Sequence, residues 1–440
     1  MSRRIARVQL DSPLPQLDRL FDYAVPEELG EVPTGVRVRV PLRTAGRLID
    51  AYVVELAEEN DAQRALSAID SVTSTAQVLP DRLYRLARRT ADRAAGSASD
   101  ILRLVIPKRQ VRVEKAWTAD AATPVPTSEA VERANSVLAE YEGLTALLDE
   151  SERGAVEAIP GIRDDVLRWT ELLAASATRM LAEGRSTIIV VPDHRDLDRL
   201  LATLQTMLPA EAIVRQDSRQ TNPDRYRAFL RSLEDAPCVV VGNRSAVYAP
   251  VQAGLVAIWD DGDPLLGEPL APYVNARDAA LLRQEQEGSA LLLVGHTRTT
   301  DAERLVMHGW LKDIHATRRV LPKVALSTPQ EMEQATQRVH SSAFAAARKA
   351  SEEGPVLVQV SRPGFSPTLV CAECRAPARC IPCGGPLAPG IAVPSRSADG
   401  AAAPHKPGRA RPARPRNCVS RHPEASAPLT SSAARSPAFG

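Results

Sequence analysis

The pattern of apolar and polar positions changes character along the chain. Alternating residues at 5–10, 36–40 and 47–55 predict strands, and the strict Val-Arg-Val-Arg-Val run at 36–40 predicts one buried and one solvated face. Pro80-Asp81 opens a pattern with apolar residues at helical spacing that continues to about residue 95. We therefore expect a small β-rich N-terminal domain with appended helices over residues 1–117.

The region from 153 to 353 has a second pattern, in which continuous apolar segments alternate with amphipathic ones. The apolar segments predict strands at 187–191, 238–241, 255–259, 290–294 and, later, 356–360. The amphipathic segments predict helices at 163–183, 194–206, 222–233, 274–286, 299–307 and 329–351. Such an alternation is typical of a parallel sheet covered by helices on both faces.

Three further segments complete the expected organisation. Residues 118–152 predict a linker followed by a short helical stretch, and residues 354–387 predict a strand plus a cysteine-rich region. Residues 388–440 are rich in Pro, Ala and Arg and hold almost no large apolar side chains. Because such a composition buries too little surface to offset chain entropy, we expect a disordered tail.

Charge and hydropathy limit the possible cellular location of the protein and the kinds of partner that it can bind. The 55 Lys/Arg and 54 Asp/Glu nearly balance, so the net charge alone gives no case for nucleic-acid binding. One stretch, Arg82–Lys115, is clearly basic. No apolar run approaches the roughly 20 residues of a transmembrane helix, and the start does not resemble a signal peptide. We expect a cytoplasmic protein with no membrane partner.

The cysteines cluster in two C-x-x-C knuckles that are separated by five residues. Thiolates at this spacing are typical Zn²⁺ ligands, and a cytoplasmic protein holds metal with them more often than disulfides. The predicted metal ligands are Cys371, Cys374, Cys380 and Cys383. Two interpretations stay open: one four-thiolate zinc site, or two knuckles without metal. Cys418 is isolated in the tail, and Cys238 lies in an apolar segment that predicts a core position.

Several motifs, in order, resemble the PriA family (primosomal protein N′) over roughly residues 4–387. They begin with Arg7-Val-Gln-Leu-Asp-Ser-Pro-Leu-Pro, Phe21-Asp-Tyr-Ala-Val-Pro26 and Gly35-Val-Arg-Val-Arg-Val-Pro41. They continue with Val241-Gly-Asn-Arg-Ser-Ala-Val-Tyr-Ala-Pro250, Trp259-Asp-Asp-Gly, Pro272-Tyr-Val-Asn-Ala-Arg-Asp278 and the cysteine knuckles. The resemblance implies a 3′-DNA-binding domain, then a RecA-like parallel α/β lobe equivalent to the first lobe of a helicase, then zinc knuckles. It also makes residues 118–152 a degenerate winged-helix region.

The resemblance implies a site for the 3′ end of a DNA strand. Asp22 would accept a hydrogen bond from the terminal 3′-OH, while Phe21 and Tyr23 would offer faces to a base. Phosphates would be neutralised by three arginines of the neighbouring strands, Arg37, Arg39 and Arg47. Alternatively, the two aromatic rings belong to the core, Asp22 is a turn residue and the arginines only solvate a strand face.

The chain departs from the family's helicase motifs at each catalytic point. Where a P-loop is expected, the residues are Ile159-Pro-Gly-Ile-Arg-Asp-Asp-Val-Leu-Arg-Trp169, and no lysine occurs between Ala116 and Leu311. The expected Asp-Glu-Glu-His box reads Asp260-Asp-Gly-Asp263, and no second lobe follows. We therefore expect neither an ATP cofactor nor enzymatic activity.

These observations predict a degenerate, non-helicase, actinobacterial-like member of the family. Its expected function is DNA-binding in replication restart at stalled or abandoned forks. Its expected partners are branched DNA with a 3′ end, primosome proteins and the machinery that loads the replicative helicase, and its expected place is the nucleoid. The alternatives are an ATP-dependent 3′-to-5′ DNA helicase and an inert product of a disrupted gene.

Overall fold

The fold comes from a computed structural model that describes residues 3–42, 47–59, 66–119, 122–319, 323–326 and 341–359. It also gives the backbone of four short strands nearer the C-terminus. The chain forms two compact units, Met1–Leu321 and Pro322–Gly440.

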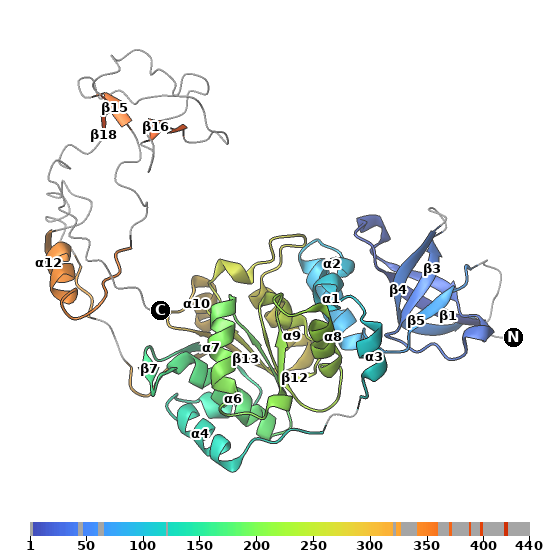
Figure 1. The fold of residues 1–440 in the computed structure, drawn as a ribbon, viewed down its shortest axis with the longest axis horizontal. Coiled ribbons are helices and arrows are strands. Elements are labelled where there is room, and N and C mark those ends of the chain that lie inside the picture. Colours follow the sequence, from blue (N-terminus) through green and yellow to red (C-terminus); the bar gives the residue numbers. More distant parts are fainter. Residues whose placement is uncertain are drawn as a thin grey trace. The chain divides into compact units, whose positions relative to one another are not determined.

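The first unit begins with a five-stranded antiparallel sheet in the order β2-β1-β4-β3-β5 (Figure 1). Its strands are β1 (Arg3–Leu10), β2 (Leu20–Ala24), β3 (Arg37–Leu42), β4 (Arg47–Glu59) and β5 (Ser71–Ser74). The alternating valines at 36, 38 and 40 are fully buried and belong to one core on one face of this sheet. The predicted β-rich start and the two-sided pattern of β3 are thus confirmed.

Helices follow the sheet and pack on its other face and on the rest of the unit. They are α1 (Asp81–Arg93), α2 (Ala98–Val105) and α3 (Val111–Ala116). Gln9 of β1 is buried and donates to the hydroxyl of Ser99 in α2 at 3.3 Å. We call the sheet and these helices, Arg3–Ala116, the N-terminal domain.

The remainder of the first unit, which we call the lobe (residues 128–319), contains a parallel sheet in the order β10-β11-β9-β12-β13-β6-β14. Its strands are β6 (Arg153–Glu157), β9 (Ser186–Val190), β10 (Ile213–Gln216), β11 (Val239–Gly242), β12 (Ala253–Trp259), β13 (Ala290–Gly295) and β14 (Lys312–Ile314). A short hairpin, β7 (Ile162–Arg163) and β8 (Val166–Leu167), follows β6. The parallel α/β lobe is confirmed.

Helices cover both faces of the parallel sheet (Figure 1). One face carries α4 (Ser128–Leu138), α5 (Leu144–Asp149), α6 (Arg168–Ala182) and α7 (His194–Leu204). The other carries α8 (Asn222–Arg231), α9 (Ala276–Glu287) and α10 (Thr300–Met307). Neighbouring strand residues such as Ile188 and Ile189 contribute to opposite cores, which explains why these strands are apolar throughout.

The structure corrects several details of the predicted pattern. The helix expected at 163–183 starts only at Arg168, because the β7–β8 hairpin occupies the preceding residues. The segment 128–150 is part of the lobe's core, since α4 and α5 pack with α6. Short strands β6, β10 and β14 were missed because charged or polar residues interrupt them and leave no continuous apolar run.

The second unit contains helix α12 (Ser341–Ala350) and the strands β15 (Leu369–Cys371), β16 (Leu387–Ala388), β17 (Ser397–Ala398) and β18 (Cys418–Ser420). The helix expected at 329–351 is therefore confirmed over Ser341–Ala350, while 329–340 lie outside the described residues. The strand expected at 356–360 is wrong for 356–359, which are irregular and exposed. Within the described residues, no helix combines the length and apolarity needed to cross a membrane.

Candidate functional site

The predicted strand-end residues lie on β2, at one edge of the N-terminal sheet. Because side chains alternate along a strand, Phe21 and Tyr23 share one face and Asp22 lies on the other. Tyr23 is buried in the sheet's core at 5% exposure, and its hydroxyl donates to the Pro41 carbonyl at 3.0 Å. Its ring is therefore a core element and offers no face to a base, contrary to our expectation.

Phe21 and Asp22 remain accessible. Phe21 is half-buried against the same core, and the guanidinium of Arg19 lies 4.4 Å from its ring centroid. The Asp22 side chain is 36% exposed, and its carboxylate lies 3.6 Å from Nε of Arg7 on β1. A surface carboxylate and a guanidinium thus lie next to each other at this site. Asp22 belongs to a regular strand and is not a turn residue.

The three arginines predicted to contact phosphate have different environments. Arg37 donates to the Pro107 carbonyl at 2.9 Å and lies over the Tyr52 ring. It therefore holds the segment after α2, and the expectation that it is a surface cation is wrong. Arg39 is exposed but pairs with Asp50 at 3.2 Å. Arg47 is exposed at the start of β4. Arg39 and Arg47 therefore remain candidates for phosphate contacts.

Five of the ten Lys and Arg residues in the basic stretch Arg82–Lys115 form ion pairs. Arg88 pairs with Asp18 at 2.5 Å, Arg89 with Glu285 at 2.8 Å, and Arg103 with Asp11 at 2.7 Å. These arginines join the helices to the sheet and to the lobe. For these arginines, the positive charge has a structural role in the folded protein.

One continuous apolar core joins α1 and α2 of the N-terminal domain to the lobe. Polar contacts reinforce it: Arg82 donates to the Pro250 carbonyl at 2.5 Å, and Trp117 donates to Glu234 at 2.7 Å. Glu114 of α3 accepts from Arg109, Ser74 and the hydroxyl of Tyr226 on α8. Burial alone would raise the pKa of Glu114, but these hydrogen bonds outweigh it and lower the pKa.

The position expected for a P-loop is occupied by the β7–β8 hairpin. Its two turn residues, Asp164 and Asp165, have φ of 50° and 62°, as a two-residue hairpin of the type I′ class requires. Arg163 pairs with Glu140 at 2.6 Å and with Glu171 at 2.8 Å, and Arg168 also pairs with Glu140. Arginine–carboxylate pairs thus join the hairpin and the start of α6 to the turn after α4, and join the hairpin to α6 itself.

An aromatic cluster begins directly after this hairpin in the chain, at the start of α6. Trp169 of α6 stacks on Trp259, the last residue of β12, with ring centroids 4.3 Å apart and planes 10° apart. The His296 ring meets Trp259 edge-on at 5.1 Å. In a nucleotide-binding lobe, the corresponding strand and helix ends flank phosphate and metal. Here, two indoles fill the space between them.

The acidic residues after β12 are also engaged. Asp261 is 5% exposed and accepts from Thr299 at 2.7 Å and from Arg277 at 3.4 Å. Asp263 caps the next 3-10 helix by accepting from the Leu265 amide. Asp260 remains partly accessible, and its pKa is raised by burial and then by Asp263 and Asp261. Among the described residues, no group of three or more His, Cys, Asp or Glu could hold a metal ion.

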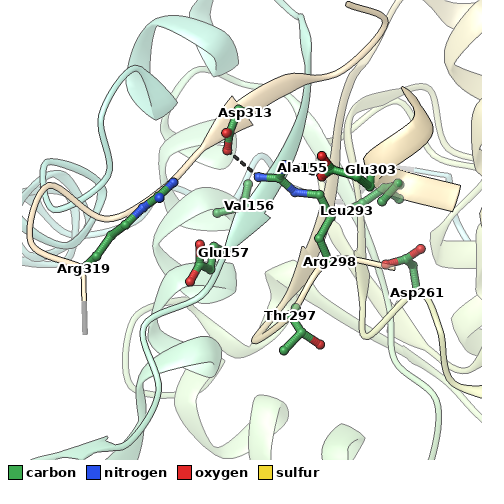
Figure 2. A pocket seen from close by; sticks show the side chains of 12 residues that line it. Ala155, Val156, Glu157, Asp261, Leu293, Thr297, Arg298, Glu303, Asp313 and Arg319 are labelled. Atoms are coloured by element: carbon green, nitrogen blue, oxygen red, sulfur yellow. Dashed lines mark hydrogen bonds and ion pairs between the residues drawn. The ribbon is translucent and has the colours of Figure 1, made fainter. Parts of the chain in front are cut away.

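A pocket of about 300 Å³ opens at the carboxyl ends of β6, β13 and β14 (Figure 2). Arg298 lies between two acidic residues, donating to Glu303 at 2.7 Å and also to Asp313. Glu157, Asp261 and Arg319 line the same pocket. Carboxylates thus outnumber guanidinium groups in this pocket, which disfavours a triphosphate.

The predicted zinc ligands fall mostly outside the described residues. Cys374, Cys380 and Cys383 are not described, and Cys371 is described only as the backbone end of β15. In the antiparallel pairing of β15 with β18, Cys371 lies opposite Cys418. The zinc site therefore stays a prediction. Cys238 is fully buried, and burial raises its pKa to about 11, which confirms its core position.

Comparisons with known proteins connect these features to a family. Residues 7–107 match the family model of the PriA 3′ DNA-binding domain (3′BD). The protein named "Probable replication restart protein PriA" is 38% identical over 391 residues in Mycobacterium bovis, covering 85% of this chain, and the Mycobacterium leprae protein of that name is equally similar. The chain belongs to the PriA family.

The match to these PriA relatives is partial. This chain spans 58% of the length of the Mycobacterium bovis protein. A solved structure of RecG bound to a three-way DNA junction is similar over 76% of this chain and 52% of that chain, with 10% identity and a TM-score of 0.31.

Two residues at the strand-end site, Arg7 and Glu55, were not predicted. Both lie in strands that the alternating pattern predicted, at 5–10 and 47–55. A charged residue inside an otherwise apolar stretch of such a strand was the signal that could have identified them. The sequence does not show the strand register, which places Arg7 opposite both Asp22 and Glu55.

Proposed function

We propose that this chain is a DNA-binding replication restart protein that recognises forks carrying a 3′ strand end and works without ATP-driven unwinding. The match to the 3′ DNA-binding domain and the PriA relatives support the DNA-binding part. The observations that carry the second part are the β7–β8 hairpin, which occupies the position expected for a P-loop, and the buried Trp169–Trp259 stack that joins the start of α6 to the end of β12.

The hairpin removes the chemistry that ATP binding needs. A P-loop presents backbone amides and a lysine to the phosphates. The hairpin instead exposes Asp164 and Asp165 at its tip, and its Arg163 is engaged by Glu140 and Glu171. Phosphates approaching this position would meet the carboxylates of Asp164 and Asp165.

The strand-end chemistry proposed for the N-terminal domain is simple. A terminal 3′-OH is a hydrogen-bond donor, which an internal nucleotide lacks. The Asp22 carboxylate can accept from it, whereas the half-buried Phe21 lies on the opposite face of β2. A hydrogen bond to a charged acceptor contributes about 1.5–3 kcal/mol, which is enough to favour a free end.

Asp22→Asn tests this site in the full-length chain. Asparagine keeps the shape but weakens the acceptor, so we expect the preference for a 3′-OH fork over a 3′-deoxy fork to fall about tenfold or more. Asp50→Asn is the matched control, because Asp50 is an exposed carboxylate of the same sheet on β4, which is separated from β2 by β1. Equal loss in both variants, or none in either, would contradict a role for Asp22.

Zinc and protein partners complete the proposal. Cys371, Cys374, Cys380 and Cys383 would hold one Zn²⁺ through four thiolates, which contributes to folding of their segment. The relatives' names as replication restart proteins support primosome proteins and helicase-loading proteins as partners.

A further inference from the structure

Three charged side chains form a row across neighbouring strands at the proposed strand-end site. In the register of the sheet, Arg7 of β1 lies opposite Asp22 of β2 on one side and opposite Glu55 of β4 on the other. Nη1 of Arg7 donates to Glu55 at 2.9 Å, whereas Nε lies 3.6 Å from Asp22. About half of the Arg7 and Glu55 side chains is exposed, so solvent and ligand reach both.

A β-bulge creates this row. The pairing of β1 with β4 shifts between Arg7 and Val8, so that Arg7 faces Glu55 while Val8 faces Val53. Val54 is the extra residue of the bulge. In a regular antiparallel ladder, Val54 would lie opposite Arg7. Bulges next to functional sites commonly redirect a side chain in this way. Here, the bulge places a second carboxylate on the guanidinium that adjoins Asp22.

Other charges close to the row are also paired. Tyr84 of α1 has a pKa raised by burial, and the charges that act on it include Arg88, Asp18 and Glu55. Of these, Arg88 already pairs with Asp18 at 2.5 Å and with Asp92 at 2.7 Å. Arg88, which shares Tyr84 as a neighbour with Glu55, is therefore already engaged by two carboxylates.

We propose that Glu55 is a specificity-determining residue of the strand-end site, because it holds Arg7 away from phosphate, and that Arg7 positions Asp22. This inference rests on the proposed function. A 3′-OH donates to a carboxylate and adds no charge. A 3′-phosphate carries between one and two negative charges and would face the Asp22 and Glu55 carboxylates, while Glu55 already holds the Arg7 guanidinium. With Glu55 in place, the row accepts hydroxyl ends and rejects phosphate ends.

The test measures binding of the full-length protein to three forks that differ only at the 3′ end: hydroxyl, hydrogen or phosphate. We expect the wild type to bind the hydroxyl end best and the phosphate end worst. Glu55→Gln releases Arg7, so affinity for the phosphate end should rise about tenfold while affinity for the hydroxyl end changes little. Glu58→Gln is the matched control, because it removes the same charge from an exposed position of the same strand.

A double variant separates the role of Arg7 from a general loss of negative charge. In Arg7→Gln/Glu55→Gln the gain for the phosphate end should disappear, because the guanidinium that would receive the phosphate is gone. An equal gain in Glu55→Gln, Glu58→Gln and the double variant would overturn the inference in favour of long-range electrostatics. An unchanged selectivity in Glu55→Gln would overturn it as well.

The three ends also separate this inference from the function on which it rests. The hydroxyl and hydrogen ends alone report whether the protein reads a 3′-OH. If the wild type binds these two equally, the strand-end function itself fails. If it distinguishes them but Glu55→Gln leaves the phosphate end as weak as before, only the role of Glu55 fails.

Discussion

The indole rings of Trp169 and Trp259 lie face to face, 4.3 Å apart at their centroids, where the start of α6 meets the end of β12. These two chain positions resemble those that hold phosphate and metal in the PriA family's helicase motifs. In this chain they are joined by a buried aromatic contact, so the region has become part of the lobe's core.

Trp259→Ala should therefore destabilise the lobe. The removal of a buried indole is expected to lower the free energy of unfolding by about 3–5 kcal/mol. Denaturant titration followed by circular dichroism measures this change. Trp310→Ala is the control, because Trp310 is only half-buried, and it should cost less. A cost for Trp259→Ala no larger than that of the control would contradict a core role for the stack.

Glu114 should contribute a pH-dependent part of the stability. Its pKa is lower in the folded state, so its contribution is fully present above the unfolded value near 4.5 and is lost as pH falls through the folded pKa. Glu114→Gln should lower the free energy of unfolding at pH 7 by about 1–3 kcal/mol and progressively less below pH 4.5. Chemical unfolding at several pH values measures this, and a difference independent of pH would contradict the linkage.

The N-terminal domain should not be stable as an isolated fragment. Leu83, Leu86 and Ile101 are almost fully buried in the core that continues into the lobe. A fragment of residues 1–117 exposes this surface, so we expect a lower melting temperature than that of residues 1–319 and a tendency to aggregate. Thermal melts of both fragments test this. Equal melting temperatures would show that the domain folds without the lobe.

The cysteine quartet should retain one zinc ion per chain. Metal analysis of the purified protein measures this directly, and Cys374→Ser should release the metal without changing fork binding. Cys238→Ser is the control, since Cys238 is buried in the lobe and holds no metal among the described residues. Two zinc ions per chain, or none, would contradict a single four-thiolate site.

The sequence predicts the architecture well where the pattern is long. Alternation in β3 and continuous apolar runs in β9, β12 and β13 identify both sheets, and the helices between the lobe's strands follow from their periodicity. Short strands such as β14 carry too few residues for a periodic signal. The β7–β8 hairpin was also missed, because its residues continue the helical pattern of α6.

The site could be predicted only in part, and for a different reason. Asp22 was identified from its motif, but whether Tyr23 faces the core depends on which face of β2 is buried, and one residue of register decides this. Arg37, Arg88 and Arg89 appear in the sequence as free cations. Their partners, such as Pro107 for Arg37 and Glu285 for Arg89, lie far away along the chain and become visible only in the fold.

The most direct test of the account compares fork binding and strand separation in a single preparation of full-length protein. A fork with a 3′-OH at the branch and its 3′-deoxy counterpart are titrated with and without MgATP. We predict tighter binding of the 3′-OH fork, the same affinities with and without ATP, no ATP turnover above background and no unwinding. Equal affinity for the two forks, or ATP-dependent strand separation, would contradict the account.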